Sequence, residues 1–324
     1  MIEILKAPPF ATVQDAGRPG WRTEGLPPGG AIDQWSLRLA NTIVGNEPDA
    51  PALEWLLGGG SLRFDRASAF CLAGARVGAW LDGAPVEDRQ ICFAPQGSVL
   101  NVGGFDSGRT LYIAIEGGIA VPKVLGSAST YLPGQFGGHL GRRLLAHDHV
   151  PLGARRWPPP SFNAAWIEKL PQPRDVATAR FIFGPNWEDL SAIARTRMVG
   201  HAFRISPDSD RAGIRLGGRI PCEGLDFAAP SEPVIPGTIE LTSDGNLIVL
   251  LADGPTSGGY PKPGVVVQAD VPVIAQRKPG ANLRFVEVTP SEALTAAHQA
   301  RSQLAGLANQ VRPKRNRMPD AVSF

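Results

Sequence analysis

Three turn-rich stretches of the sequence gather polar and charged side chains that have the chemistry to bind or transform a ligand. In the first, residues 11–41, Gln14, Asp15 and Arg18 lie in a loop rich in glycine and proline that leads into a predicted helix. Glycines in such a loop allow backbone N–H groups to face an anion or an amide carbonyl. The alternative is a rigid loop in which Asp15 and Arg18 pair with each other. The pattern alone leaves both interpretations open.

The second stretch, RISPDSDRAGIRLGG (204–218), is a dense polar connection between two predicted strands. Its polar side chains are Ser206, Asp208, Ser209, Asp210 and Arg211. This density exceeds what a turn requires, although an Asp–Arg pair can also serve as a simple turn clamp. The stretch is therefore a candidate binding segment.

The third stretch, residues 250–267, begins with an apolar strand that ends at Asp253. A glycine-containing turn follows and presents Tyr260 and Lys262. An aspartate that accepts a hydrogen bond or a proton, together with a lysine as a point charge, suits a small amide or an anionic substrate. The alternative is an edge hairpin that carries an exposed lysine.

Several common catalytic motifs do not occur in the sequence. It contains no GxxxxGK[ST] phosphate loop, no GxGxxG dinucleotide turn, no GxSxG nucleophile elbow and no HExxH metal motif. His147 and His149 flank Asp148, but no further Cys or His cluster completes a metal shell, so a solvated turn is the favoured interpretation. We expect no metal site, and we expect that any ATP used is not held by a loop of the usual kind in this chain.

Composition points to a protein built from short strands. The 324 residues include 38 glycines and 31 prolines, which disfavours long helical bundles and favours strands joined by tight turns. Hydrophobic residues make up 43% and charged residues 19%, which is enough for a packed core. The segment 311–324 has a net charge of +3 against +2 for the whole chain, so the rest of the chain, at −1, is close to neutral. A nucleic-acid partner is therefore not expected.

The cysteines and the N-terminus favour a cytoplasmic protein. Cys71, Cys92 and Cys222 are widely spaced and form no CxxC motif, as is typical of reduced thiols. The first residues lack the features of a secretory signal, and the most apolar run, 247–252, is far too short to span a bilayer. We expect no membrane association.

Two β-rich units are predicted. In the first, Asp33 caps a helix that ends at Gly45, residues 51–57 form either a short helix or a strand, and strands joined by turns follow from Ser61. The expected strands are SLRFD, AFCLAG, VGAWLDG, ICFAPQG, SVLNVGG and TLYIAIEGG, with a hairpin at Asp82-Gly83.

A proline-rich segment, 157–175, separates this unit (1–156) from a second one (176–290). The second unit opens with the strand FIFGP and an amphipathic helix over 187–200. Its further strands are predicted in AFRIS, GIRLGG, GTIELT, LIVLLAD, GVVVQAD, VPVIAQ and LRFVEV. Residues 291–324 are expected to form a helix capped by Ser291 and a basic tail.

Several motifs in order resemble the biotin-dependent carboxyltransferase / allophanate hydrolase subunit 2 family. They are VQDAGRPG, LPPGGAIDQWSLRLAN, FGGHLGRRL, SPDSDRAGIRL, IPGTIEL and TSGGYPKPGVVV, and they run from about residue 3 to residue 290. The resemblance implies a mainly β fold of two cyclophilin-like β-barrel units with a few short helices. Stand-alone bacterial members of this family are the C components of 5-oxoprolinase, which act with the A and B components of that enzyme to open 5-oxoproline to glutamate with ATP.

The resemblance also implies site residues. Asp253, Tyr260 and Lys262 match positions that we expect to be catalytic. The expected substrate-binding residues are Asp15, Arg18, His139, Ser206, Asp210 and Arg211. Many relatives carry a polar pair containing glutamine where this chain has Gly254-Pro255, so an amide hydrogen-bonding side chain is missing at that place.

Three functions remain open at this point. The chain is a component of an ATP-dependent 5-oxoprolinase, the carboxyltransferase component of a biotin-dependent urea or amide carboxylase, or a regulatory protein that sequesters a kinase inhibitor similar to the 5-oxoprolinase B component. No biotin-carrier segment resembles any part of the chain, so biotin is not expected on it. We further expect Arg18, Arg211 and Lys262 to converge on one cleft between the units, where they would attract the carboxylate of 5-oxoproline.

Overall fold

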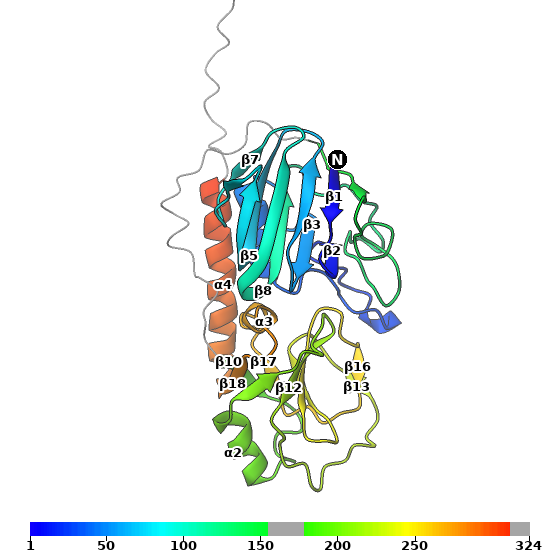
Figure 1. Ribbon diagram of the computed structural model, residues 1–324. Coiled ribbons are helices and arrows are strands. Elements are labelled where there is room, and N and C mark those ends of the chain that lie inside the picture. The colour runs from blue at the N-terminus through cyan, green and yellow to red at the C-terminus, as the bar shows by residue number, and fades with distance from the viewer. Residues whose placement is uncertain (155–177, 312–324) are drawn as a thin grey trace, which may run out of the picture.

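Two β-rich units lie end to end, and one long helix runs along both (Figure 1). The computed structural model describes residues 1–154 and 178–311. The proline-rich segment expected at 157–175 and the basic residues after 311 lie outside the described residues. Among the described residues, the last strand of the first unit ends at Val150, and the first strand of the second unit begins at Thr178.

The first unit is a nine-stranded sheet in the order β2-β3-β8-β4-β1-β9, with β5 paired along β8. Its strands are β1 (Ile2–Lys6), β2 (Phe10–Gln14), β3 (Ala52–Leu56), β4 (Gly60–Phe64), β5 (Ser68–Leu81), β6 (Ala84–Pro85), β7 (Cys92–Ala94), β8 (Val99–Ile115) and β9 (His149–Val150). Among the described residues, strand pairing leaves this sheet open as a half-barrel.

Two expected pairs of strands are single long strands. AFCLAG and VGAWLDG belong to β5, and SVLNVGG and TLYIAIEGG belong to β8. The glycines that suggested turns lie at irregularities within the β5–β8 ladder, whose register shifts between Gly74 and Arg76. A glycine at φ +107°, such as Gly74, bends a strand without ending it.

Local signals predicted several elements of the first unit correctly. Helix α1 (Gln34–Ile43) begins after Asp33, whose carboxylate accepts a hydrogen bond from the N–H of Ser36 at 3.0 Å. Within the run 51–57, where a short helix or a strand was expected, Ala52–Leu56 form strand β3, and every residue of β3 is buried. The Asp82-Gly83 hairpin is confirmed, with both residues at positive φ. A short 3-10 helix, η1 (Arg22–Glu24), interrupts the loop that precedes α1.

The second unit is a closed barrel in the order β10-β17-β14-β15-β12-β11-β18. Its strands are β10 (Thr178–Phe183), β11 (Phe203–Ile205), β12 (Gly213–Gly217), β14 (Thr238–Leu241), β15 (Leu247–Leu250), β17 (Gly264–Val266) and β18 (Asn282–Glu287). A separate ribbon pairs β13 (Glu232–Pro233) with β16 (Ser257–Gly258). Helix α2 (Ala192–Gly200) starts later than expected, after the cap Ser191.

The prediction of a strand at VPVIAQ is wrong, because Val271–Ala275 forms helix α3. Pro272 lies in the first turn, where its fixed φ and missing N–H suit a helix start. The buried residues Val271, Ile274 and Ala275 recur at helical spacing. An apolar run this short fits both the helical and the strand period, and only the position of the proline favours the helix.

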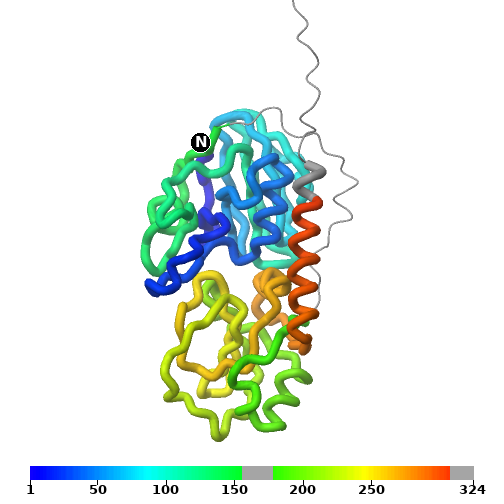
Figure 2. Tube along the Cα trace, turned by 180° about the vertical axis from the view of Figure 1, so that it is seen from behind, coloured from blue at the N-terminus to red at the C-terminus, as the bar shows by residue number. Residues whose placement is uncertain are grey.

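The C-terminal helix α4 (Pro290–Val311) packs against α1 of the first unit and β10 of the second (Figure 2). Its cap is Thr289 rather than Ser291: the Thr289 hydroxyl accepts from the N–H of Glu292 at 3.3 Å. The Glu292 carboxylate accepts from the N–H of Thr289 at 2.8 Å. This helix therefore belongs to both units.

The fold class is confirmed, with each unit packed around its own apolar core. A small apolar contact of Ile32 and Leu56 with Ala275 joins the units. Within the described ranges, no helix combines the length and the apolar character that a membrane span requires.

Candidate functional site

Asp15 organises a loop of the first unit. Its Oδ1 accepts the hydroxyl groups of Ser127 and Ser129, each at 2.6 Å, and its Oδ2 accepts the N–H of Ala128 at 2.6 Å. The N–H of Gly17 also donates to Oδ1, at 2.8 Å. The carboxylate is thus occupied by loop donors rather than by the guanidinium of Arg18, and its role here is to hold the loop that carries Arg18.

Arg18 is a buried cation with free donors. Its side chain is 1% exposed, Nη2 donates to the carbonyl of Ser129 at 2.5 Å, and the guanidinium lies 4.9 Å from the centre of the Phe136 ring. Nε and Nη1 have no hydrogen-bond partner among the residues that the structure describes. Burial lowers the pKa of Arg18, while the nearby carboxylates of Asp15 and Asp253 act in the opposite direction.

Glycine at position 29 allows Arg18 and Asp253 to approach the same place. A Cβ on Gly29 would lie 2.9 Å from Arg18 Nη1 and 3.7 Å from Asp253 Oδ1. The φ of Gly29 is +60°, which also disfavours a larger residue. A donor from the first unit and an acceptor from the second therefore flank one point at the boundary between them.

Arg211 joins the two units through an ion-pair cluster. Its Nε and Nη2 bind the carboxylate of Asp253 at 2.7 and 3.1 Å, and Nη2 also donates to the carbonyl of Gly30 at 2.6 Å. Its Nη1 pairs with Oε1 of Glu54. Burial alone would lower the pKa of Arg211, but Asp253 and Glu54 outweigh it and the pKa is raised. Arg211 therefore stays charged and fixes the orientation of Asp253.

Glu54 is a member of this cluster that the sequence analysis did not identify. It is 0% exposed, and its Oε2 accepts the Tyr112 hydroxyl at 2.6 Å and the N–H of Ile32 at 3.1 Å. Burial, followed by the charge of Glu54, raises the pKa of Tyr112. The available signal was a glutamate within the otherwise apolar strand ALEWL, because a buried charge requires a partner.

Lys262 has a different set of partners. Its Nζ donates to Oε2 of Glu232 at 3.1 Å and to the carbonyl of Tyr260 at 3.2 Å. Glu240 is 4% exposed, and its Oε1 has no hydrogen-bond partner within the described part of the chain. Burial raises the pKa of Glu240, while Lys262 acts to lower it. The structure thus brings Arg18 and Arg211 to Asp253, whereas the hydrogen bonds of Lys262 lie within the second unit.

The remaining predicted residues make turn contacts. His139 Nε2 lies 3.7 Å from Asp148 Oδ1, and Arg142, which binds both oxygens of Asp148, is the main cause of that carboxyl group's lowered pKa. Ser206 Oγ accepts the N–H of Asp208 at 3.2 Å.

Asp210 shapes the turn that carries Arg211. Its Oδ1 accepts the N–H groups of Ala212 and Gly213 at 2.8 and 3.2 Å. Such contacts are typical of an Asx turn. We assign Asp210 to the support of the Arg211 turn, while Tyr260 is 41% exposed and free to meet a ligand or a partner.

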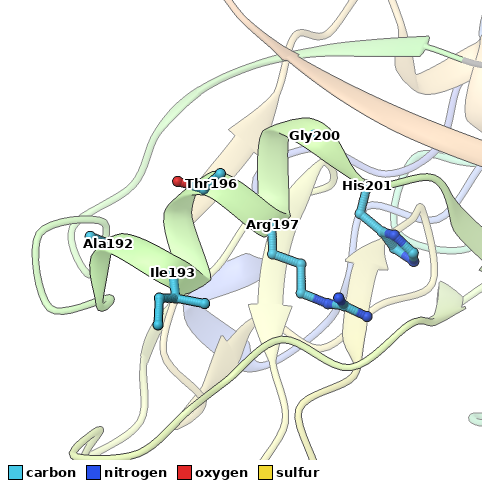
Figure 3. A pocket seen from close by; sticks show the side chains of 6 residues that line it. All are labelled: Ala192, Ile193, Thr196, Arg197, Gly200 and His201. Carbon is cyan, nitrogen blue, oxygen red and sulfur yellow. The ribbon is translucent and has the colours of Figure 1, made fainter.

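The predicted site residues form no metal-binding group, and they do not line the surface hollow beside α2. Within residues 1–154 and 178–311, no group of three or more His, Cys, Asp or Glu side chains could hold a metal ion. Figure 3 shows the hollow, which is lined by α2 and the residue that follows it and contains none of the predicted site residues. The cluster between the units is therefore the candidate site.

Comparison with known proteins shows the family of the chain. A family model described as "Carboxyltransferase domain, subdomain A and B" matches residues 24–287. The C component of the Escherichia coli K12 5-oxoprolinase is 34% identical over 296 residues, which cover 91% of this chain and 94% of that protein. The urea amidolyase of Saccharomyces cerevisiae is 30% identical over 318 residues, covering 89% of this chain but 17% of that protein.

A solved structure supports the same relationship. The Kluyveromyces lactis urea carboxylase matches 94% of this chain with a TM-score of 0.87 at 29% identity, over 29% of its own length. The motif-based resemblance is therefore confirmed by the family model, by nearly full-length relatives and by the fold. The chain belongs to the carboxyltransferase domain family.

Proposed function

We propose that this chain is the C component of an ATP-dependent 5-oxoprolinase and acts with the A and B components of that enzyme to open 5-oxo-L-proline to L-glutamate. The observation that carries the proposal is the match to the C component of the E. coli enzyme, which covers 91% of this chain and 94% of that protein. The corresponding protein of Haemophilus influenzae is 32% identical over 90% of this chain and 93% of its own length.

The cluster between the units suits a lactam substrate. A cyclic amide presents its carbonyl and its N–H on the same side of the ring, so a receptor needs a donor and an acceptor close together. Arg18 Nη1 supplies the free donor and Asp253 Oδ1 the acceptor, both close to Gly29. A donor on the carbonyl oxygen draws electrons from the amide carbon and favours attack there.

ATP is proposed as a substrate of the assembled enzyme, with no component assigned as the one that binds it. Hydrolysis of a lactam coupled to ATP consumes two waters and yields glutamate, ADP and phosphate, so a nucleotide site is required. The chain has no GxxxxGK[ST] loop. In the proposed assembly, the present chain orients the amide, and the nucleotide is not held by a loop of that kind in this chain.

A carboxyltransferase activity is the second candidate. The family description and the structural match to a urea carboxylase favour it. In that case carboxybiotin would come from a separate protein, and the amide would act as the nucleophile. Urea also presents a carbonyl and an N–H, so the cluster would suit it too; the nearly full-length match to the C component of the E. coli enzyme is what favours the first candidate.

Coexpression with the A and B components tests the proposal. We expect the purified assembly to hydrolyse ATP in a 5-oxoproline-dependent manner and to release glutamate, and we expect the chain alone to show negligible turnover. An inactive assembly in which the chain still binds the B component would favour the regulatory function, in which the chain sequesters a kinase inhibitor. Carboxylation of urea in the presence of a biotin carboxylase would favour the second candidate.

A further inference from the structure

The side chain of Gln276 is buried between the two units, in a polar site formed by Asp33, Arg109 and Thr110 that we call the socket. It is the C-cap of α3 in the second unit and is 6% exposed. Its Oε1 accepts the N–H groups of Arg109 and Thr110, each at 3.1 Å. Its Nε2 donates to the carbonyl of Thr110 and to Oδ2 of Asp33, each at 2.8 Å. All four hydrogen-bonding positions of the amide are thus used, and all four partners belong to the first unit.

An irregularity in the β5–β8 ladder forms this socket. The register passes from Gly74–Leu111 directly to Arg76–Ser107, which leaves residues 108–110 of β8 without a partner on β5. Gly74 and Gly108 both have positive φ, and a Cβ on them would lie 3.1 and 2.8 Å from the amide of Gln276. The bulge therefore exposes backbone groups that β5 would otherwise pair, and Gln276 satisfies them.

The socket is connected to the candidate site by buried hydrogen bonds. The N–H of Asp33 donates to the Tyr112 hydroxyl at 2.9 Å, and that hydroxyl donates to Glu54 at 2.6 Å. Glu54 pairs with Arg211, which binds Asp253. A continuous polar chain thus runs from the cap of α1 to the acceptor at the site.

We propose that Gln276 is a positioning residue for the site shared by the two units, an inference that rests on the proposed function. Arg18 comes from the first unit and Asp253 from the second, so their separation depends on how the units are held. Gln276 fixes that placement at the α3 contact, which lies on the α4 side of the molecule (Figure 1). A displacement of about 1 Å at a reacting group lowers a rate about a hundredfold.

Substitution of Gln276 in the full assembly tests the proposal. Gln276→Met keeps the shape of the side chain and removes its hydrogen bonds. We expect it to lower kcat for 5-oxoproline-dependent turnover by roughly 10- to 100-fold. Gln268→Met, at an exposed glutamine just before α3, is the matched control and should leave kcat unchanged.

A compensating pair separates positioning from simple loss of stability. Gln276→Glu places a carboxylate against Asp33, whereas Asp33→Asn combined with Gln276→Glu restores a donor opposite an acceptor, and asparagine still caps α1. We expect kcat of the double variant to be about tenfold higher than kcat of Gln276→Glu. A double variant no better than Gln276→Glu would contradict the proposal.

Hydrogen exchange provides a readout that does not depend on activity. In the isolated chain, Gln276→Met should speed exchange of the Arg109 and Thr110 amides, and Gln268→Met should not. Unchanged exchange would refute the socket, and a fully active Gln276→Met assembly would refute the positioning role. An inactive wild-type assembly would instead refute the proposed function. The exchange result would still test whether Gln276 protects the Arg109 and Thr110 amides.

Discussion

The cluster between the units and the Lys262 cluster place similar residues in different settings. In the first, Arg211 is shared by Asp253 of its own unit and Glu54 of the other, and all three side chains are buried. In the second, Lys262 binds Glu232, which is 62% exposed, and neither partner leaves the second unit. The cluster of Arg211 forms only when the two units are packed together, whereas the cluster of Lys262 forms within the second unit alone. Residues of a shared site are therefore expected to couple function to stability.

The largest effect is expected from Arg211→Met. Removal of this guanidinium leaves Asp253 and Glu54 buried without their counter-charge, which costs about 3–5 kcal/mol of unfolding free energy. Urea unfolding of the isolated chain measures it. Arg195→Met is the control, because its ion pair with Glu188 is exposed and contributes at most about 1 kcal/mol. Equal losses of unfolding free energy in the two variants would mean that the buried cluster contributes no more to stability than the exposed ion pair.

Asp253→Asn is expected to have the next largest effect, and mainly on activity. Asparagine keeps an oxygen for Arg211 but is a much weaker base and acceptor, so turnover of the assembly should fall by roughly 10²- to 10⁴-fold. Because Asp253 is paired in a buried site, a modest fall in Tm should accompany the loss. Full turnover by this variant would exclude Asp253 from the chemistry.

Lys262→Ala should lower turnover less, by about tenfold, because it removes the hydrogen bonds to Glu232 and to the carbonyl of Tyr260 that hold the exposed Tyr260 in place. Its folding should change little, since Glu232 is exposed to water. Lys123→Ala, at an exposed lysine of the first unit, controls for a general effect of lost charge. Steady-state kinetics of the assemblies that carry Lys262→Ala and Lys123→Ala test this. Identical rates would show that Lys262 only stabilises the β13–β16 ribbon.

The smallest effect concerns the pH dependence of stability at Glu240. Burial raises its pKa above the ordinary 4.5, so the folded chain retains a proton that the unfolded chain has lost. The stability of the wild-type chain should therefore fall, relative to Glu240→Gln, as pH rises from about 4.5 through the raised pKa. Tm values of the two proteins across this range test the sign. A constant Tm difference would show that Glu240 titrates normally.

Local sequence signals predicted those elements whose cause is local. Asp33 marks the start of α1, and Asp82-Gly83 marks a hairpin, because capping and turn chemistry act over a few residues. Glycines 74 and 108 were harder to interpret, since a glycine that allows a bulge and a glycine that ends a strand look alike until the partner strand is known. The helix at α3 was missed for a related reason: five residues are too few to fix a period.

The candidate site was predictable only in part. Motifs identified Arg18, Arg211 and Asp253, and the structure assembles these three. Glu54 and Gln276 escaped notice because their importance comes from partners more than 150 residues away in the chain, as in the pairs Glu54–Arg211 and Thr110–Gln276. Long-range partners of this kind depend on how the two units pack, which local patterns do not encode.

The closure of the second barrel has a consequence for biosynthesis. Its first strand, β10, pairs in parallel with its last strand, β18, and β18 also pairs with β11. On the ribosome, all the described strands of the first unit are present once Val150 has emerged, but the barrel stays open until residues 282–287 follow. During that interval β10 and β11 present unpaired edges, and contacts between such distant segments form slowly. We therefore expect the second unit to be the part of the nascent chain that most needs protection by chaperones, with the first unit serving as a finished surface against which it folds.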